Sequence, residues 1–419
     1  MAEYDIADVS LADAGRKRID WNESDMPVLL GIRERFRRER PLKGMRLSVC
    51  LHITAKTAAL VRTLAAGGAD VVLVASNPLS TQDDVAASLV VNDEIPVFGM
   101  RGESLETFRS HINVALDMKP HVLCDDGADL TSNLLQRGIN ATQLPIGATE
   151  ETTAGVKRFK AMEAQGVLPF PVIAVNESRT KHMFDNRYGT GQSAIDGIIR
   201  ATNLLLAGRT VVVAGYGWCG RGVASRAAGL GAKVIVTEVN PVKALEAAMD
   251  GFRVLPMADA VREADVIIAV TGNRTVVSDA EFADLKDGAI LANAGHFNVE
   301  IDVAALERLA TDKSQPRTHV TTYHMPDGKR FNLVGEGRLV NLVAGEGHPP
   351  AVMDMSFANQ ALASELLART AGSMPHIVHR LPDSVDIMIA SLKLKAMGIT
   401  LDTLSEAQQH YLNSWQEGT

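Results

Sequence analysis

Residues 44–176 alternate between short apolar runs and amphipathic stretches. The runs are rich in Val, Ile and Leu and have the length of buried strands, whereas the stretches between them carry apolar residues at helical spacing. This alternation is typical of a parallel sheet with helices on both faces, so we predict a doubly wound domain. The predicted strands are 45–53, 69–76, 95–100, 119–126, 141–149 and 169–176, with helices including 56–68 and 104–118.

A second α/β unit begins near residue 192. A helical stretch at 193–208 leads into the apolar run RTVVVAGYG (209–217), and further alternation passes through 264–272 and 288–297 to about residue 340. The remainder, 350–419, has helical patterns at 361–370 and 384–398. The predicted fold class is therefore α/β, with two doubly wound, Rossmann-like parallel sheets and a helical C-terminal segment.

Charge and composition exclude several classes of partner. The chain has 419 residues, 22% of them charged, and a net charge of −8, which disfavours nucleic acid. Cys50, Cys124 and Cys219 form no CxxC pair and no metal-ligand spacing, so we expect buried reduced thiols, no bound metal and a cytoplasmic location. The polar N-terminus is unlike a signal peptide, and no apolar run is long enough for a membrane span.

Polar residues gather just after the predicted strands. His52, Asn77, the pair Asp125–Asp126 and the pair Glu150–Glu151 each follow an apolar run. Ligands of open α/β sheets bind at the carboxyl ends of the strands, so these loops would deliver ionisable groups to one rim. The alternative for any single residue is that Asp and Asn simply favour turns.

The run at 209–217 continues into a GxGxxG array. Gly215, Gly217 and Gly220 follow a β-branched strand and open a helix, the context that a dinucleotide fingerprint requires. Glu238, 18 residues beyond Gly220, ends the next strand, where a carboxylate binds a ribose diol and repels a 2′-phosphate. We predict NAD rather than NADP, although the nearby Lys243 would tolerate a phosphate. The neighbouring loop residues predicted to contact the cofactor are Trp218, Cys219, Arg221 and Gly222.

Eight further motifs narrow the function. They are CLHITAKTA, STQDD, CDDGADLT, ATEETTAGV, NESRTKHMFDNRYGTGQS, NAGHFNVEID, EGRLVNL and GEGHP, in that order over residues 44–360. In order and spacing the chain resembles the S-adenosylhomocysteine hydrolase family. The resemblance implies one tightly bound NAD per subunit, which oxidises the 3′-hydroxyl of the sugar, permits loss of homocysteine from the 5′ carbon and addition of water, and then restores the hydroxyl.

The same resemblance implies roles for individual residues. Lys181 would handle the 3′-hydroxyl proton, for which burial or a cation must lower its pKa, and Asp185 would contact the same hydroxyl. The alternative is an ordinary surface i,i+4 salt bridge. Glu151 would bind the sugar diol, and Asp126 would help to move the proton of the 4′ carbon. His52 and His296 would assist the departure of the thiolate from the 5′ carbon and the addition of water there. The implied substrate contacts are Thr54, Lys56, Thr57, Asn77 and His348, and the further NAD contacts are Thr152, Thr153, Asn186, Thr271 and Asn341.

The resemblance also implies a domain order and an assembly. The NAD domain (186–347) would be inserted between two parts of the substrate domain (1–185 and 348–385), with hinges near 186–191 and 342–350 and a C-terminal segment at 386–419. We expect a homo-oligomer, a tetramer or dimer. The chain lacks the Lys- and Tyr-bearing tail of longer members, carries Thr190 where many have Cys, and has Ala154 where a Thr is usual.

Lys56 is the sharpest departure from the family pattern. The matching position usually holds Glu or Gln near the purine 6-substituent, and Lys can only donate there. This suggests S-inosyl-L-homocysteine as an alternative substrate, unless Lys56 turns to solvent or a neighbouring acid. Two other classes remain as alternatives: an NAD-dependent 2-hydroxyacid dehydrogenase, and an inactive regulatory relative that binds NAD and a partner protein.

Overall fold

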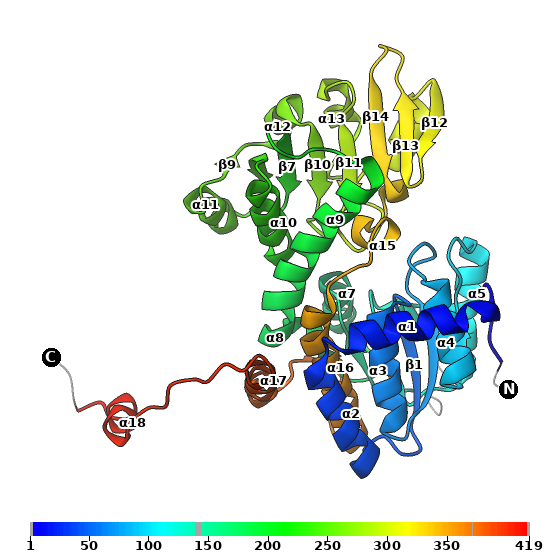
Figure 1. Ribbon diagram of the computed structural model, residues 1–419, viewed down its shortest axis with the longest axis vertical. Coiled ribbons are helices and arrows are strands. Elements are labelled where there is room, and N and C mark those ends of the chain that lie inside the picture. Colours follow the sequence, from blue (N-terminus) through cyan, green and yellow to red (C-terminus); the bar gives the residue numbers. More distant parts are fainter. Residues whose placement is uncertain (1–2, 139–143, 371, 417–419) are drawn as a thin grey trace.

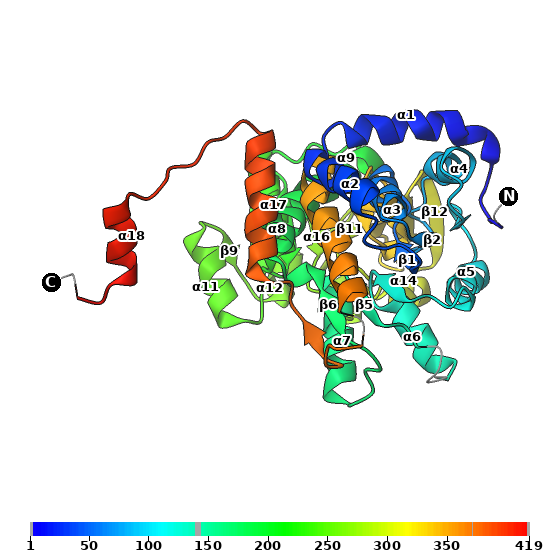
Figure 2. The same cartoon turned by 90° about the horizontal axis from the view of Figure 1, so that it is seen from below.

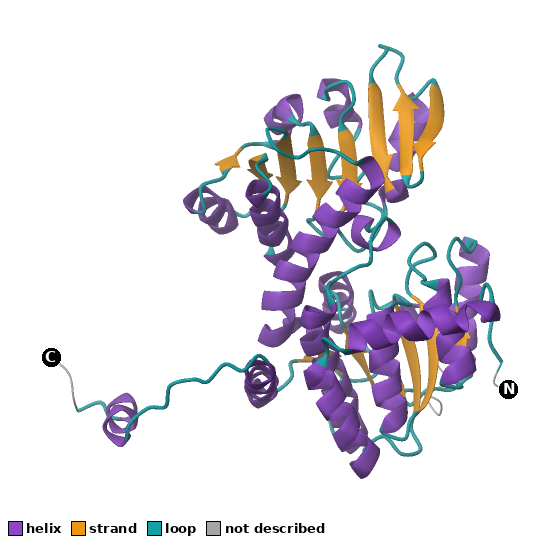
Figure 3. Ribbon diagram, in the orientation of Figure 1, coloured by secondary structure: helices purple, strands orange, loops and turns teal. Residues whose placement is uncertain are grey.

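The computed structural model describes residues 3–138, 144–370 and 372–416. Figure 1 shows two α/β bodies, one above the other, and Figure 3 shows a sheet at the centre of each. One sheet has seven strands in the order β15-β6-β5-β4-β1-β2-β3, and the other has eight in the order β12-β13-β14-β11-β10-β7-β8-β9. The prediction of two doubly wound sheets is therefore confirmed.

The seven-stranded sheet is parallel in all of its strand pairs. Its inner strands are almost completely buried, because helices cover both faces. The order reverses between β4 and β1, and the loops after these two strands therefore open a crevice at the carboxyl edge. The strands are β1 (Arg46–Leu51), β2 (Asp70–Ala75), β3 (Val97–Phe98), β4 (Val122–Asp125), β5 (Gly147–Glu150), β6 (Val172–Ala174) and β15 (Val378–His379).

Two apolar cores lie on the faces of this sheet. One joins it to helices from the N-terminal region and to the long α16, and the other packs Ile112, Leu130 and Phe159 of three helices against the opposite face. The helices are α1 (Ala12–Glu23), α2 (Pro27–Glu39), α3 (Ala55–Ala66), α4 (Asp83–Asn92), α5 (Leu105–Asp117), α6 (Asp129–Gln136), α7 (Thr153–Ala164) and α16 (Pro350–Arg369). Of the predicted strand at 141–149, residues 141–143 lie outside the described residues.

The eight-stranded sheet is mixed. Its parallel part reverses order between β7 and β10, which is the second switch point, but β13 pairs antiparallel with both β12 and β14. Tight turns at His319 and Gly328, both with positive φ, connect these strands, and periodicity did not reveal the edge because Asp312–Arg317 is exposed along its whole length. The strands are β7 (Thr210–Ala214), β8 (Lys233–Thr237), β9 (Arg253–Val254), β10 (Val266–Ala269), β11 (Ile290–Asn293), β12 (Asp312–Arg317), β13 (Val320–His324) and β14 (Arg330–Val334).

Helices cover both faces of this second sheet around two further apolar cores. They are α10 (Trp218–Gly229), α11 (Pro241–Met249), α12 (Met257–Glu263), α13 (Asp279–Asp284), α14 (Val303–Leu309) and α15 (Val340–Val343).

Two segments join the bodies. The first is a continuous helical column made of α8 (Arg179–Lys181), the π-helix η4 (His182–Gly189) and α9 (Thr190–Thr202), visible in green in Figure 1. The second returns from α15 through residues 344–349 into α16. The predicted boundary at 185/186 thus falls inside a helix rather than in a flexible linker.

The C-terminal segment leaves the body. After α17 (Asp383–Ala396) the chain extends to α18 (Glu406–Asn413), which projects away from both sheets in the two views of Figures 1 and 2. Within the described part of the chain, no helix combines the length and apolar character needed to cross a membrane.

Candidate active site

A cavity of about 1790 Å³ lies between the two bodies and is lined by residues of both. Loops that follow β1, β4 and β5 contribute one side, and loops that follow β7, β8, β10 and β11 contribute another. A pocket for one small molecule is typically about 300–1,000 Å³, so this cavity has room for more than one ligand.

The glycine-rich loop forms one end of the cavity. Gly215 has a φ of 103°, which favours glycine, and a Cβ on Gly217 would meet no atom within 4 Å, so the absence of that side chain leaves the cavity open. Gly220 serves the turn itself, because its Cβ would lie 2.0 Å from the Gly215 carbonyl oxygen. Gly215, Gly217, Trp218 and Cys219 line the cavity.

Three predicted loop contacts lie off the cavity wall. Besides Gly220, Gly222 packs against the column, where a Cβ would lie 1.7 Å from the Arg187 carbonyl oxygen. The Arg221 guanidinium lies 4.5 Å from the Trp218 ring centroid and pairs with Glu246. Sequence spacing alone did not separate these packing positions from the residues that face the cavity.

Glu238 lies on the cavity wall at the end of β8. Its carboxylate accepts hydrogen bonds from the backbone N–H groups of Tyr216, Val239 and Asn240, at 2.8, 2.7 and 2.9 Å. Burial opposes its ionisation, but these amides outweigh burial and lower the pKa of Glu238. The ionised acid suits a ribose diol, and Lys243 lines the same region.

Lys181 and Asp185 form a buried pair rather than a surface salt bridge. The Lys181 Nζ lies 3.1 Å from Asp185 Oδ2, and the side chains are 6% and 2% exposed. Burial opposes the ammonium charge, yet Asp185 and Glu151 outweigh it and raise the pKa of Lys181. Burial alone therefore does not lower the pKa of Lys181 in the protein, because two acids face the amine.

The partners of this pair hold the charges in place. Burial would raise the pKa of Asp185, but Lys181 and His348 outweigh it and lower that pKa well below its usual range. Asp185 is hydrogen-bonded to His348 Nδ1 and accepts from the Ser356 hydroxyl at 2.8 Å. Burial raises the pKa of Glu151 to about 8, and its Oε2 is buried without a hydrogen-bond partner among the described residues. Glu151 therefore carries a proton at neutral pH and has an oxygen free for a ligand.

A second acid–base group joins the two bodies. Asp126 lies between two imidazoles, with Oδ2 3.3 Å from His52 Nε2 and Oδ1 3.6 Å from His296 Nδ1. His52 also meets the Ser80 hydroxyl at 2.8 Å, and burial lowers the pKa of His52 to about 4, which leaves its ring neutral. Asp126 Oδ1 accepts no hydrogen bond from the described residues. Two imidazoles and a carboxylate also suit a borderline divalent metal, so assays need a chelator control.

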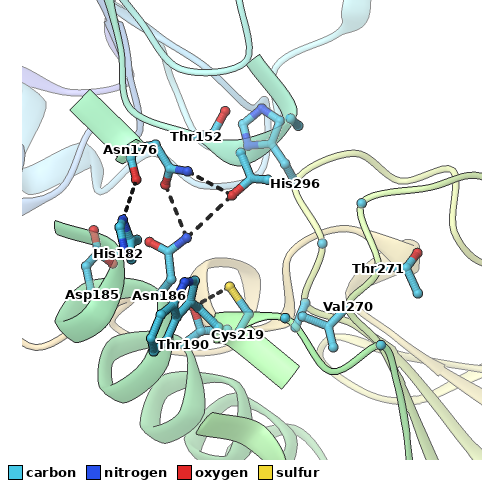
Figure 4. Close-up of a pocket in the computed structure, with 18 of the residues that line it drawn as sticks. Thr152, Asn176, His182, Asp185, Asn186, Thr190, Cys219, Val270, Thr271 and His296 are labelled. Atoms are coloured by element: carbon cyan, nitrogen blue, oxygen red, sulfur yellow. Dashed lines mark hydrogen bonds between the residues drawn. The ribbon is translucent and has the colours of Figure 1, made fainter. Parts of the chain in front are cut away.

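An amide cluster supports the lysine. The Lys181 ammonium donates to Asn176 Oδ1 at 3.1 Å and to Asn186 Oδ1 at 2.9 Å. Figure 4 shows the hydrogen bond between the Asn176 and Asn186 amides. The Asn176 amide also donates to the Thr153 hydroxyl at 3.0 Å. Sequence reasoning missed Asn176, although its position at the end of a strand run was a usable signal.

Of the remaining predicted contacts, Asn77 lies off the cavity wall and the others line it. Asn77 Oδ1 accepts from the Leu79 N–H at 2.9 Å and stabilises a turn, which was the alternative for such residues. Thr54 caps α3. Thr190 meets His348 Nε2 at 3.2 Å and donates to the Cys219 sulfur at 3.5 Å, so the hydroxyl has partners at this departure from the family pattern. Cavity-lining residues also include Thr54, Thr57, Thr152, Thr153, Asn186, Thr271, Asn341 and His348.

Lys56 turns toward the second connection between the bodies. Its buried ammonium donates to the Glu346 carbonyl oxygen at 2.5 Å, and Gln82 donates to the Glu346 carboxylate at 3.3 Å. Burial lowers the pKa of Lys56 to about 8. Lys56 nevertheless lines the cavity, and two of its three N–H donors are not used by this bond.

Fold and cavity define a two-domain, dinucleotide-dependent enzyme with buried acid–base groups on opposite bodies. Comparison with known proteins gives the family. The model for the NAD-binding domain of S-adenosyl-L-homocysteine hydrolase matches residues 186–347, and the model for S-adenosyl-L-homocysteine hydrolase itself matches residues 3–145. The chain belongs to the S-adenosyl-L-homocysteine hydrolase family.

Full-length relatives agree with these matches. An adenosylhomocysteinase of Aquifex aeolicus is 58% identical and covers 100% of both chains, and one of Thermosynechococcus vestitus is 56% identical over 99% of this chain and 97% of its own. An S-inosyl-L-homocysteine hydrolase of Methanopyrus kandleri is 54% identical and covers 100% of this chain and 98% of its own.

Proposed function

We propose that the protein reversibly hydrolyses S-adenosyl-L-homocysteine to adenosine and L-homocysteine, with NAD as its resident cofactor. The observation that carries this proposal is that two buried carboxyl oxygens, Glu151 Oε2 and Asp126 Oδ1, have no hydrogen-bond partner among the described residues and belong to residues that line one cavity. Buried polar atoms without partners are rare, and a bound sugar would supply the missing hydrogen bonds.

The residues present suit NAD. The open face of Gly217 permits close approach of a diphosphate to the start of α10, and ionised Glu238 suits the adenosine ribose. Thr152, Thr153, Asn186, Thr271 and Asn341 would complete the contacts from the rest of the cavity. NAD, when bound, supplies a hydride acceptor for the 3′ carbon and later returns the hydride.

Lys181, Asp185 and Glu151 would serve the 3′ side of the sugar. Glu151, protonated at neutral pH, can donate to one hydroxyl of the diol. Lys181 can receive the 3′-hydroxyl proton only after its own proton leaves, which the raised pKa opposes in the protein alone. A cation bound nearby favours that loss by Coulomb repulsion, so we expect the lysine to act as a base only when the cavity is loaded.

His52, Asp126 and His296 would serve the 4′ and 5′ side. The Asp126 carboxylate can hold the 4′ proton, and neutral His52 can accept a proton from water as its oxygen bonds to the 5′ carbon. A protonated imidazole can donate to the sulfur as the carbon–sulfur bond breaks. Because His52 and His296 come from different bodies and both lie beside Asp126, a substrate bound there would lie between the two bodies.

The test is incubation of purified holoenzyme with S-adenosyl-L-homocysteine in the presence of a chelator, with free thiol and nicotinamide absorbance followed together. We expect many thiols per subunit and no net accumulation of reduced nicotinamide. Stoichiometric cofactor reduction by a 2-hydroxyacid would instead support the dehydrogenase alternative. Binding of NAD without turnover of any nucleosyl-homocysteine would support the inactive relative.

S-inosyl-L-homocysteine is a second candidate substrate. Lys56 lines the cavity with two N–H donors unused by Glu346, and a relative of 54% identity bears that substrate in its name. A carbonyl at the purine 6-position would accept from the ammonium, whereas an amino group cannot. Comparison of kcat/KM for the two nucleosides decides between them.

We further infer a cytoplasmic homo-oligomer, a tetramer or dimer, with the domain order 1–185, 186–347, 348–385 and 386–419. The free cysteines support a reducing compartment, and exposed apolar residues on the C-terminal segment, including Ile387, Leu401, Leu412 and Trp415, support burial in an assembly. Light scattering after size exclusion, for the full chain and for a chain ending at residue 397, tests the assembly.

A further inference from the structure

Arg158 on α7 lies outside the acid–base groups but contacts two of the three loops that carry the 4′- and 5′-side residues, those with Asp126 and His296. Its Nη1 donates to the Gly127 carbonyl oxygen at 2.5 Å and to Asp129 Oδ1 at 2.8 Å. Its guanidinium carbon lies 5.5 Å from the centroid of the Phe297 ring, which belongs to the other body. One side chain thus joins the loop after β4 to the loop after β11.

Gly127 is held through both of its backbone groups. Its N–H donates to the buried Glu150 carboxylate at 3.0 Å, while its carbonyl accepts from Arg158. Gly127 directly follows Asp126. A Cβ on Gly127 would lie 2.5 Å from His296 Nε2, so the imidazole packs directly on this backbone. The position of the Gly127 peptide therefore affects both Asp126 and His296.

Phe297 lies between Arg158 and His296 and contacts both side chains. The His296 and Phe297 rings are 4.6 Å apart and nearly perpendicular, at 82°. A guanidinium over an aromatic face is attracted by the ring quadrupole and holds the ring against it. Since the Phe297 ring packs edge-to-face on His296, fixing one ring restricts the other.

We propose that Arg158 is a positioning residue for the 5′ half of the reaction. It holds Asp126 through Gly127 and His296 through Phe297, and it makes no contact with the Lys181 side of the cavity among the contacts of the described residues. The proposal rests on the proposed function for the chemistry of its readout, but the geometry it describes is independent of the substrate.

The test separates the two halves of the reaction. Holoenzyme variants Arg158→Met and Arg158→Lys are assayed for thiol release from S-adenosyl-L-homocysteine. They are also assayed for 3′-oxidation of 5′-deoxyadenosine, which has no 5′ leaving group, from the absorbance of reduced nicotinamide. We expect Arg158→Met to lower kcat for thiol release about 10- to 100-fold, as small misplacements of catalytic groups do, with KM and 3′-oxidation nearly unchanged. Arg158→Lys should be intermediate, because Lys lacks the planar fork.

Two controls sharpen the result. Lys160→Met changes a half-exposed cation on the same helix, which pairs with Glu177, and should leave both half-reactions as in the wild type. Phe297→Leu should lower thiol release, and its effect should not add to that of Arg158→Met, since both act through one ring contact. Equal loss of both half-reactions, or full additivity, would show a merely structural role and overturn the proposal.

Crystal structures of wild-type and Arg158→Met holoenzyme provide a readout that needs no turnover. A displaced His296 ring supports the proposal, and an unmoved ring overturns it whatever the activity. Wild-type holoenzyme that neither releases thiol nor oxidises 5′-deoxyadenosine would overturn the proposed function, while the crystal comparison would still decide the role of Arg158.

Discussion

Replacement of Lys56 by Gln should change which purine the enzyme prefers. In the wild type the buried Lys56 ammonium donates one N–H to the Glu346 carbonyl oxygen, and its other N–H groups can only donate to a ligand in the cavity. A Gln side chain can keep the donation to Glu346 through its NH₂ group and offer its carbonyl oxygen to an adenine amino group. The substitution thus replaces a mispaired donor by a matched acceptor.

The magnitude follows from the cost of an unpaired buried polar group. That cost is about 1–3 kcal/mol, which corresponds to roughly 5- to 150-fold in a rate ratio. We expect Lys56→Gln to raise the ratio of kcat/KM for S-adenosyl- over S-inosyl-L-homocysteine by this factor. Lys56→Met, which removes the donor without adding an acceptor, is the matched control and should give a smaller change.

The pH dependence gives a second reading of the same residue. Because burial lowers the pKa of Lys56 to about 8, the ammonium loses its proton as the pH rises through this value, and the neutral amine can then accept a hydrogen bond. The wild-type ratio should therefore move toward the adenosyl substrate between about pH 7 and pH 9, and the Gln variant should not. A ratio that is unchanged by both substitution and pH would refute a role of Lys56 at the purine.

Three other predictions concern the cofactor loop and the buried acids. Gly217→Ala should fold like the wild type but bind NAD more weakly, whereas Gly222→Ala should unfold at lower denaturant concentration, because its Cβ would lie 1.7 Å from the Arg187 carbonyl oxygen; urea titration and NAD titration separate the two. Asp185→Asn leaves the Lys181 charge without its main partner and should lower the free energy of unfolding by about 3–5 kcal/mol at pH 7; a loss well below 1 kcal/mol would mean that the pair is solvated. The raised pKa of Glu151 means that the native state binds a proton more tightly than the unfolded state, so its contribution to stability is complete below about pH 4.5 and is lost as the pH rises through about 8; Glu151→Gln should flatten that decline in urea melts at a series of pH values, and parallel curves would contradict it.

Much of the fold was predictable because its signals are local. Buried strands such as β7 and β10 are continuous apolar runs, and the glycine loop between β7 and α10 has its own spacing. The antiparallel edge formed by β12, β13 and β14 was not predictable, because Asp312–Arg317 is exposed along its whole length and has no apolar periodicity. Such a strand forms because of the neighbour that it pairs with.

The positions of the main site residues were predictable from the sequence, but their charge states were not. Motifs located Lys181, Asp126 and His296, but charge states depend on groups that meet only after folding. The Lys181 ammonium faces Asp185, which is near in sequence, and Glu151, which is not. The attraction of these two acids outweighs burial and raises the pKa of Lys181. The role of Arg158 was invisible for the same reason, since Phe297 lies 139 positions along the chain from it and on the other body.

The division of the acid–base groups between two bodies makes the chemistry depend on how the two bodies lie relative to each other. His296 reaches Asp126 only when the inserted body is complete and docked on the flanking one. This acid–base group is therefore complete only when both bodies are folded and lie against each other as they do here.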